Sequence, residues 1–187
     1  DVKGLDVKRS SFPKAFQEIM ADVLISILRG QTEEEISDKV LDFKKSMVNQ
    51  DMKVIAKNSA VKNLKKYLPK GKRNLFQFMK GTPAHVKAAI AYNDCLKHFD
   101  APFKYEPMKN GDKVKWVYLK DNPLGLSGLA FTGYKDPPEI NEFINTYIDH
   151  NKIFERELKG KLQDFYDAIG WGDVVSEQRT AEKFFTF

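Results

Sequence analysis

Two stripes of apolar residues with helical spacing constrain the fold of this chain most strongly. Apolar residues spaced by three and four run from Phe16 to Leu28 and again from Ile36 to Met47, and this spacing predicts two amphipathic helices. Gly30 supplies a stop between them. The sequence from Thr32 to Glu35 is a capping box, with acidic residues at the positive end of the second helix dipole. We therefore expect an antiparallel helical hairpin.

Besides the capping box, start signals mark three helices. Ser10-Ser11-Phe12-Pro13 predicts a serine cap and a proline in the first turn of the first helix. Thr82-Pro83 starts another helix, and Asp136 to Glu139 caps a long C-terminal helical region with a break expected near His150. Gly170 ends that region.

Strand signals are confined to the middle of the chain. Residues 103–108 and 113–119 flank Asn110-Gly111, the favoured two-residue hairpin turn, and so predict a β-hairpin. Val54 to Ala56 reads as a short strand, and Val61 to Leu68 as a short basic helix. Asn122 to Gly125 is a turn leading to a short apolar segment. The predicted class is α+β and predominantly α-helical, with a helical hairpin, long C-terminal helices and a small antiparallel β-hairpin.

The net charge of +5 is unevenly distributed along the chain. Met52 to Asn93 contains ten Lys or Arg and no Asp or Glu, and the remaining residues carry a net charge of −5. A long basic stretch without counter-charge repels itself and favours a polyanionic partner, which points to nucleic acid. Three other interpretations stay open: a solvated lysine face, a stand-alone nucleic-acid-binding module, and a protein-interaction domain whose basic loop meets an acidic protein.

Several function classes lack their sequence signatures. No run approaches the 18 apolar residues of a membrane span, and a single Cys95 with three scattered His offers neither a disulfide nor zinc-ligand spacing. Paired carboxylates on a strand, as metal-dependent nucleotidyl transfer requires, are missing, and so is a Gly-rich phosphate loop. The sequence therefore predicts no catalytic site, metal or cofactor in this chain, and a cytoplasmic setting.

Four segments resemble family B DNA polymerases, especially the replicative polymerases of T-even-type bacteriophages. Lys3 to Lys14 resembles the junction between palm and thumb, and Thr82 to Asn93 resembles a thumb segment. Asp112 to Gly125 is similar to the following strand and its Asn-Pro-x-Gly turn, and Tyr147 to Arg156 to the last long helix. The segments occur in the family's order across nearly the whole chain.

This resemblance implies a thumb domain that holds primer–template duplex without catalysing the reaction. Residues 1–12 would be the palm–thumb junction, 13–170 the thumb and 171–187 a C-terminal tail. Palm, fingers and their divalent metal ions would lie upstream of Asp1 or on a separate subunit of a split polymerase. We interpret the start at Asp1 as a cut end. The resemblance also implies that the protein acts in the cytoplasm of an infected bacterium.

The resemblance also implies which residues bind DNA. Lys87 and Arg156 match basic positions of the family, Lys8 and Arg9 lie in the junction, and Lys80 lies beside a further basic position. Another basic position of the last helix falls between Lys159 and Lys161. The chain departs from the family at Ser127, where relatives often carry Lys.

The C-terminal tail resembles the peptide by which partners bind a sliding clamp. Its candidate residues are Gln178, Ala181, Phe184 and Phe185. A short helical turn would place the alanine and both aromatic rings on one side, as an apolar plug for a surface groove. The alternative is that these aromatic side chains pack onto the thumb itself.

Overall fold

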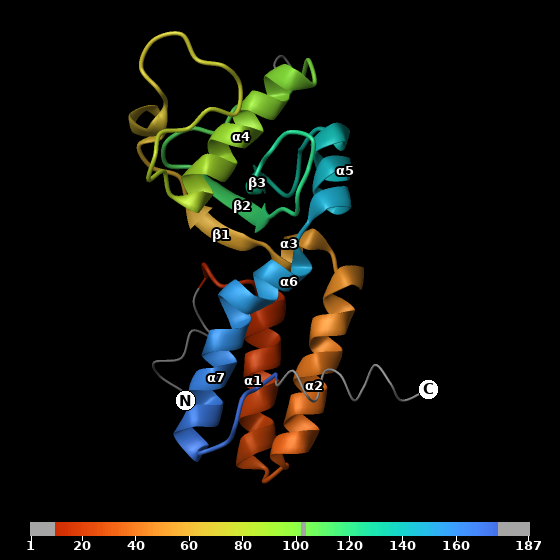
Figure 1. Ribbon diagram of the computed structural model, residues 1–187. Helices are drawn as coiled ribbons and strands as arrows, with labels where there is room; N and C mark the ends of the chain where they lie inside the picture. The colour runs from red at the N-terminus through yellow and green to blue at the C-terminus, as the bar shows by residue number, and fades with distance from the viewer. Residues whose placement is uncertain (1–9, 102–103, 176–187) are drawn as a thin grey trace. The chain divides into compact units, whose positions relative to one another are not determined.

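The computed structural model describes residues 10–101 and 104–175 and divides the chain into two compact units (Figure 1). Unit 1 comprises the residues up to Ile55 together with those from His150 onward, and unit 2 comprises Ala56–Asp149. Helices provide most of the regular structure, and unit 2 contains a three-stranded antiparallel sheet. The predicted helix-dominated α+β class is confirmed.

Unit 1 begins with the predicted helical hairpin, formed by α1 (Lys14–Leu28) and α2 (Glu33–Ser46). The capping box is complete: the Thr32 hydroxyl accepts a hydrogen bond from the Glu35 amide at 3.3 Å, and the Glu35 carboxylate accepts one from the Thr32 amide at 2.8 Å. Gly30 has φ +76°, a left-handed conformation that favours glycine and ends α1.

The start of α1 differs from the expectation. Pro13 occupies the N-cap position, and no side chain there accepts a hydrogen bond from the helix. The serine cap predicted from Ser10 and Ser11 is therefore wrong. Burial of Phe12, whose carbonyl accepts a hydrogen bond from the side chain of Gln17 at 2.8 Å, fixes the entry of the chain instead.

The C-terminal helical region has the predicted break and one irregularity. α5 (Pro138–Tyr147) ends in unit 2, and α6 (His150–Ile153) starts unit 1 again. It continues through a π-helical segment (Phe154–Lys159) into α7 (Gly160–Ile169). Gly170 follows with φ +76° and ends α7 as predicted.

The core of unit 1 joins α1, α2 and α7. The Phe16 ring meets Phe43 edge-on with centroids 6.0 Å apart, and the hydroxyls of Ser37 and Tyr166 lie 2.9 Å apart. Fully buried side chains come from all three helices and from the π-helical segment: Phe16, Val23, Ile36, Val40, Phe154, Leu158 and Tyr166.

The described residues of the predicted tail pack against α7. The Trp171 ring lies edge-on to Tyr166 with centroids 5.2 Å apart. Val174 is buried, and its amide donates a hydrogen bond to the side chain of Gln163 at 3.0 Å.

Unit 2 is built on the sheet β1 (Lys57–Ala60), β2 (Lys113–Tyr118) and β3 (Gly128–Phe131), with β2 in the centre. The helix α4 (Ala84–His98), which starts after Pro83 as predicted, packs on the sheet, and α5 contacts β3 (Figure 1). A Cβ atom at Gly128 would lie 2.9 Å from the Val117 carbonyl oxygen, so this close approach of strands requires glycine.

The predicted β-hairpin over residues 103–119 is wrong. Its second arm is confirmed as β2, but the partners of β2 are β1 and β3, and residues 104–108 form no strand. The side chain of Asn93 accepts a hydrogen bond from the Met108 amide at 2.7 Å and donates one to the Met108 carbonyl at 2.9 Å. These backbone groups are therefore satisfied without strand pairing.

Two further local predictions are corrected. Val54 to Ala56 is not a strand, because Met52–Ile55 forms a helical turn (α3) and the strand begins at Lys57. Of the predicted helix from Val61 to Leu68, only the 3₁₀ turn Leu64–Tyr67 forms.

Asp136 does not cap α5 as predicted. Pro137 is the N-cap residue, and the Asp136 carboxylate accepts hydrogen bonds from the amides of Thr132 at 2.7 Å and Gly133 at 2.8 Å. It fixes the turn that precedes the helix. The predicted turn at Asn122 forms, with Gly125 at φ +63°.

Candidate nucleic-acid interface

The two units differ in charge. Unit 2 contains 16 Lys and Arg against 9 Asp and Glu, whereas unit 1 contains 15 against 17. The positive excess of the chain therefore belongs to unit 2, and a polyanion would be attracted there first.

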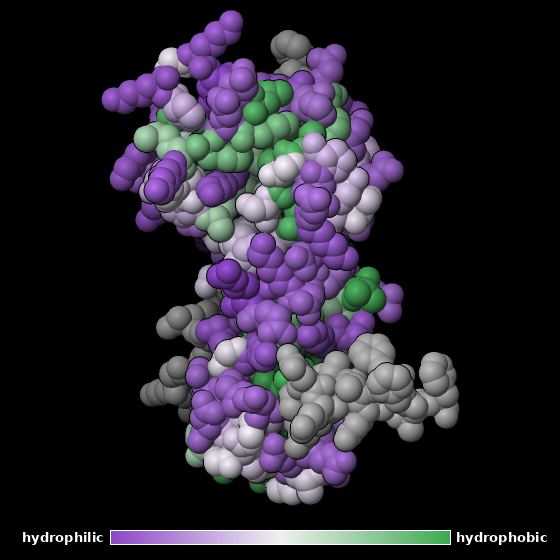
Figure 2. All heavy atoms as spheres, in the orientation of Figure 1, coloured by the Kyte–Doolittle hydropathy of each residue, from purple (hydrophilic) through white to green (hydrophobic). Residues whose placement is uncertain are grey.

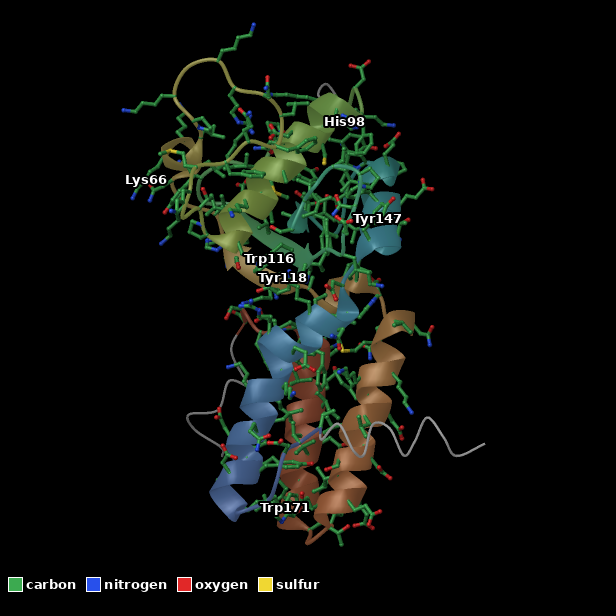
Figure 3. The ribbon with its side chains drawn as sticks, in the orientation of Figure 1. Lys66, His98, Trp116, Tyr118, Tyr147 and Trp171 are labelled. Carbon is green, nitrogen blue, oxygen red and sulfur yellow. The ribbon has the colours of Figure 1, made fainter. Side chains whose placement is uncertain are left out.

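The strongest concentration of charge lies between β1 and α4, in residues 61–82, which we call the basic segment. Six of its lysines are exposed, and none forms an ion pair with a carboxylate in the described part of the chain: Lys62, Lys65, Lys66, Lys70, Lys72 and Lys80. Figure 2 shows hydrophilic side chains standing out from this part of unit 2. Figure 3 shows nitrogen-tipped side chains extending outward around the labelled Lys66. Cations arranged in this way can contact phosphates without reading sequence.

A hydrogen bond joins the last part of the basic segment to its 3₁₀ turn, and a second fixes its C-terminal end. The Met79 amide donates to the Tyr67 carbonyl at 3.1 Å, and the Thr82 hydroxyl donates to the Met79 carbonyl at 2.6 Å. Lys80 is therefore held beside the 3₁₀ turn that carries Lys66. The same turn contacts α4, the helix that carries the partly exposed Lys87.

Arg73 is the one cation of the basic segment that is neutralised. Its guanidinium pairs with the Asp94 carboxylate through two nitrogens, one contact being 3.0 Å between Nη1 and Oδ1. The side chains are 15% and 2% exposed, respectively. Asp94 is the first acidic residue after the acid-free stretch, so the stretch is not entirely without counter-charge. Arg73 anchors the loop and is not available to a phosphate.

The same carboxylate also holds the backbone of the loop. The Phe76 amide donates to Asp94 Oδ2 at 2.9 Å, and Arg73 Nε donates to the Gln77 carbonyl at 3.2 Å. Phe76 has φ +62°, a conformation that costs free energy for a side chain of this size and persists only when its surroundings enforce it. The exposed lysines are thus carried by an ordered loop.

His85 lies near Lys57 without adding to the positive charge of unit 2. Burial and the nearby charge of Lys57 hold the pKa of His85 below its usual value, so the ring is neutral at neutral pH. Lys57 itself lies over the Trp116 ring, 5.5 Å from its centroid.

The three unit 1 candidates within the described residues differ in their surroundings. Arg156 is exposed on the π-helical segment and forms no ion pair with a described residue. Lys159 pairs with Glu155 at 3.1 Å, and Lys161 lies 5.4 Å from the centroid of the Phe12 ring. Among the described unit 1 candidates, Arg156 is therefore the most accessible to a phosphate.

Glu155 forms ion pairs with two lysines of unit 1. Burial favours its neutral form, but hydrogen bonds and charges from Lys159 and Lys44 outweigh burial and lower the pKa of Glu155. Its carboxylate lies 3.1 Å from the Lys44 ammonium. Lys159 is consequently balanced by a carboxylate in this structure.

Six predicted site residues lie outside the described residues. They are the junction cations and the clamp-binding candidates: Lys8, Arg9, Gln178, Ala181, Phe184 and Phe185.

Across residues 10–101 and 104–175, no group of three or more His, Cys, Asp or Glu side chains could hold a metal ion. The helices of the same ranges include none long and apolar enough to cross a bilayer.

Fold and surface together define an α+β chain with an ordered, exposed cluster of lysines. No protein-family model matches it. It is similar to a segment of the DNA-directed DNA polymerase of Enterobacteria phage T4, with 26% identity over 171 residues. The match covers 90% of this chain and 18% of the polymerase, so the chain spans less than a fifth of this relative's length.

Proposed function

We propose that this chain is the thumb of a phage family B DNA polymerase and holds primer–template duplex by its phosphates. The observation that carries the proposal is the group of six exposed, unneutralised lysines on the anchored basic segment. The similarity to a phage DNA polymerase over 90% of the chain supports it independently. Lysine contacts to phosphate position a protein on duplex irrespective of sequence, as a polymerase requires.

The proposal separates holding from catalysis. Nucleotidyl transfer would belong to the palm and fingers of the same or a split polymerase, where divalent metal ions would clamp the reacting oxygens. The thumb adds affinity for the duplex close to that site, in the cytoplasm of the infected host.

Salt dependence of primer–template affinity tests the duplex contact. If about five phosphates are contacted, log K falls with log salt with a slope of roughly −4 to −5. Replacing both Lys66 and Lys80 by Gln should reduce the slope by about 2. Lys14→Gln is the control, because this exposed unit 1 lysine already pairs with Glu18 at 3.7 Å. A flat salt dependence contradicts the proposal.

Competition separates this function from the alternative of a basic domain that binds an acidic protein. If the domain holds duplex, competing duplex DNA should displace bound primer–template more effectively than heparin does at equal charge. Equal displacement by both would favour a general polyanion or acidic-protein site.

Clamp docking by the tail is a second part of the proposal and is based on the sequence pattern alone. Replacing Phe184 and Phe185 by Ala should abolish binding to a sliding clamp, since paired aromatic anchors each contribute on the order of 2 kcal/mol or more. Duplex affinity should stay the same. Clamp binding that survives the double substitution excludes this role for the tail.

A further inference from the structure

A groove of about 450 Å³ in unit 2 is not used by the function proposed above. It lies between the segment that enters β2 and the turn that follows β3. Its size falls within the roughly 300–1,000 Å³ of small-ligand sites. The lining residues on which the inference depends are Lys104, Tyr105, Lys113, Thr132, Tyr134 and Lys135.

Tyr134 presents its ring to solvent from an ordered turn. The residue is 87% exposed. Asp136 binds the amides of Thr132 and Gly133, and the Thr132 hydroxyl accepts hydrogen bonds from the amides of Tyr134 at 3.4 Å and Lys135 at 3.2 Å. The backbone under the ring is therefore fixed before any ligand arrives, which lowers the entropic cost of binding.

The opposite wall of the groove is also fixed. Asn93 holds both backbone polar groups of Met108, and the Lys109 amide donates to the Asp112 carboxylate at 2.7 Å. The Gly111 amide donates to the Val61 carbonyl at 2.8 Å. A groove between two ordered walls is preorganised for a ligand.

The charges of the groove suit an anion. Within the described residues, Lys104, Lys113 and Lys135 form no ion pair. Of the two lining acids, Glu106 pairs with Lys109 at 3.5 Å, and Asp112 binds the Lys109 amide. The three ammonium groups therefore outnumber the one lining carboxylate without an ion pair, that of Asp112, whose hydrogen bond from a neutral amide leaves its charge in place.

We propose that this groove binds a nucleotide unit, with its base stacked on Tyr134 and its phosphate held by the groove lysines. An aromatic face combined with nearby cations is how proteins bind single strands without sequence preference. The inference deepens the proposed function, since it adds a single-strand subsite to a duplex-holding domain. A free nucleotide carries the same chemistry as one nucleotide of a strand.

Matched oligonucleotides isolate the stacking contact. The full chain should bind a short single-stranded DNA about tenfold more tightly than an abasic strand of equal length, because only the first carries a base to stack. Tyr134→Ala should remove this difference, and Tyr134→Phe should retain it. Lys135→Gln should weaken binding of both strands, whereas Lys120→Gln, an exposed unit 2 lysine outside the groove, should weaken them less.

Two comparisons between the wild-type chain and Tyr134→Ala distinguish the possible ligands. Displacement of the strand by deoxyadenosine monophosphate from wild type, but not from Tyr134→Ala, identifies a free nucleotide as the natural ligand, and failure to displace identifies a strand. Equal affinity of wild type and Tyr134→Ala for the base-containing strand overturns the groove proposal. Primer–template affinity is measured in parallel. Absence of salt-dependent duplex binding by the wild-type chain would contradict the thumb function. Tyr134→Ala should leave duplex binding unchanged.

Discussion

At the scale of single residues, Asp94 organises the surface that we assign to DNA although it does not face solvent. Its carboxylate neutralises Arg73 and receives the amide of Phe76. Both bonds connect α4 to the loop that carries Lys70 and Lys72. Removing either partner of such a pair is strongly destabilising, because the other charge is then buried without compensation.

Asp94→Asn should therefore destabilise unit 2 and loosen the loop. We expect the free energy of unfolding to fall by about 3 kcal/mol, at the lower end for a broken buried pair because Arg73 keeps some exposure. Denaturant titration measures the change, and trypsin should cleave faster after Lys70 and Lys72. The exposed Asp121→Asn should change neither quantity; an unaltered midpoint for Asp94→Asn would contradict the anchoring role.

The anchor could not be predicted from the sequence. Arg73 and Asp94 are 21 positions apart, and nothing local distinguishes this arginine from the lysines around it. The only signal was that Asp94 is the first acidic residue after the basic stretch and follows an apolar helix face. The exposed lysines, by contrast, were predictable, since composition alone revealed the missing counter-charge.

At the scale of elements, local signals predicted helices well and strand partners poorly. The capping box at Thr32 and the stops at Gly30 and Gly170 depend on neighbouring residues, and all three formed. The pairing of β1 with β2 joins residues more than 50 positions apart. An Asn-Gly pair suggested a nearer partner, but the Asn110 side chain accepts a hydrogen bond from the Leu64 amide at 2.9 Å.

Thr32→Ala tests the contribution of the capping box to unit 1. Loss of the hydroxyl leaves the Glu35 amide without its acceptor, and we expect the free energy of unfolding to fall by about 1 kcal/mol. Ser46→Ala is a matched control, because this exposed hydroxyl lies at the other end of α2, where it donates to the Phe43 carbonyl and accepts from the Gln50 side chain. Thermal unfolding compares the two; equal melting temperatures would mean that the box contributes little.

At the scale of the whole molecule, the excess of positive charge in unit 2 predicts where duplex DNA should protect the chain. Hydrogen exchange with and without primer–template should show the largest slowing in residues 61–82. Little change is expected in the first turn of α2, where three glutamates would repel phosphate. Protection concentrated on α2 would contradict the proposed interface.

The sequence predicted the class of the whole molecule but did not separate the two units. Unit 1 is assembled from both ends of the described chain, and such an arrangement has no marker in composition. The break near His150 was predicted, but nothing in the helical pattern indicated that the chain passes there from unit 2 back into unit 1.

In sequence, unit 2 is inserted between the two parts of unit 1, and its two ends pair with β2 and with the residue that follows β2. Lys57 pairs with Trp116, and Ile148 forms a bridge with Leu119. The two partners, Trp116 and Leu119, are three positions apart in the chain. At the rise of a strand this separation is about 10 Å. A domain whose first and last residues lie close together can be exchanged for another domain, or replaced by a short linker, without breaking the chain of the unit into which it is inserted. Chimaeras that swap Ala56–Asp149 between related chains are thus a practical route to altering the cationic surface separately from the helices that carry it.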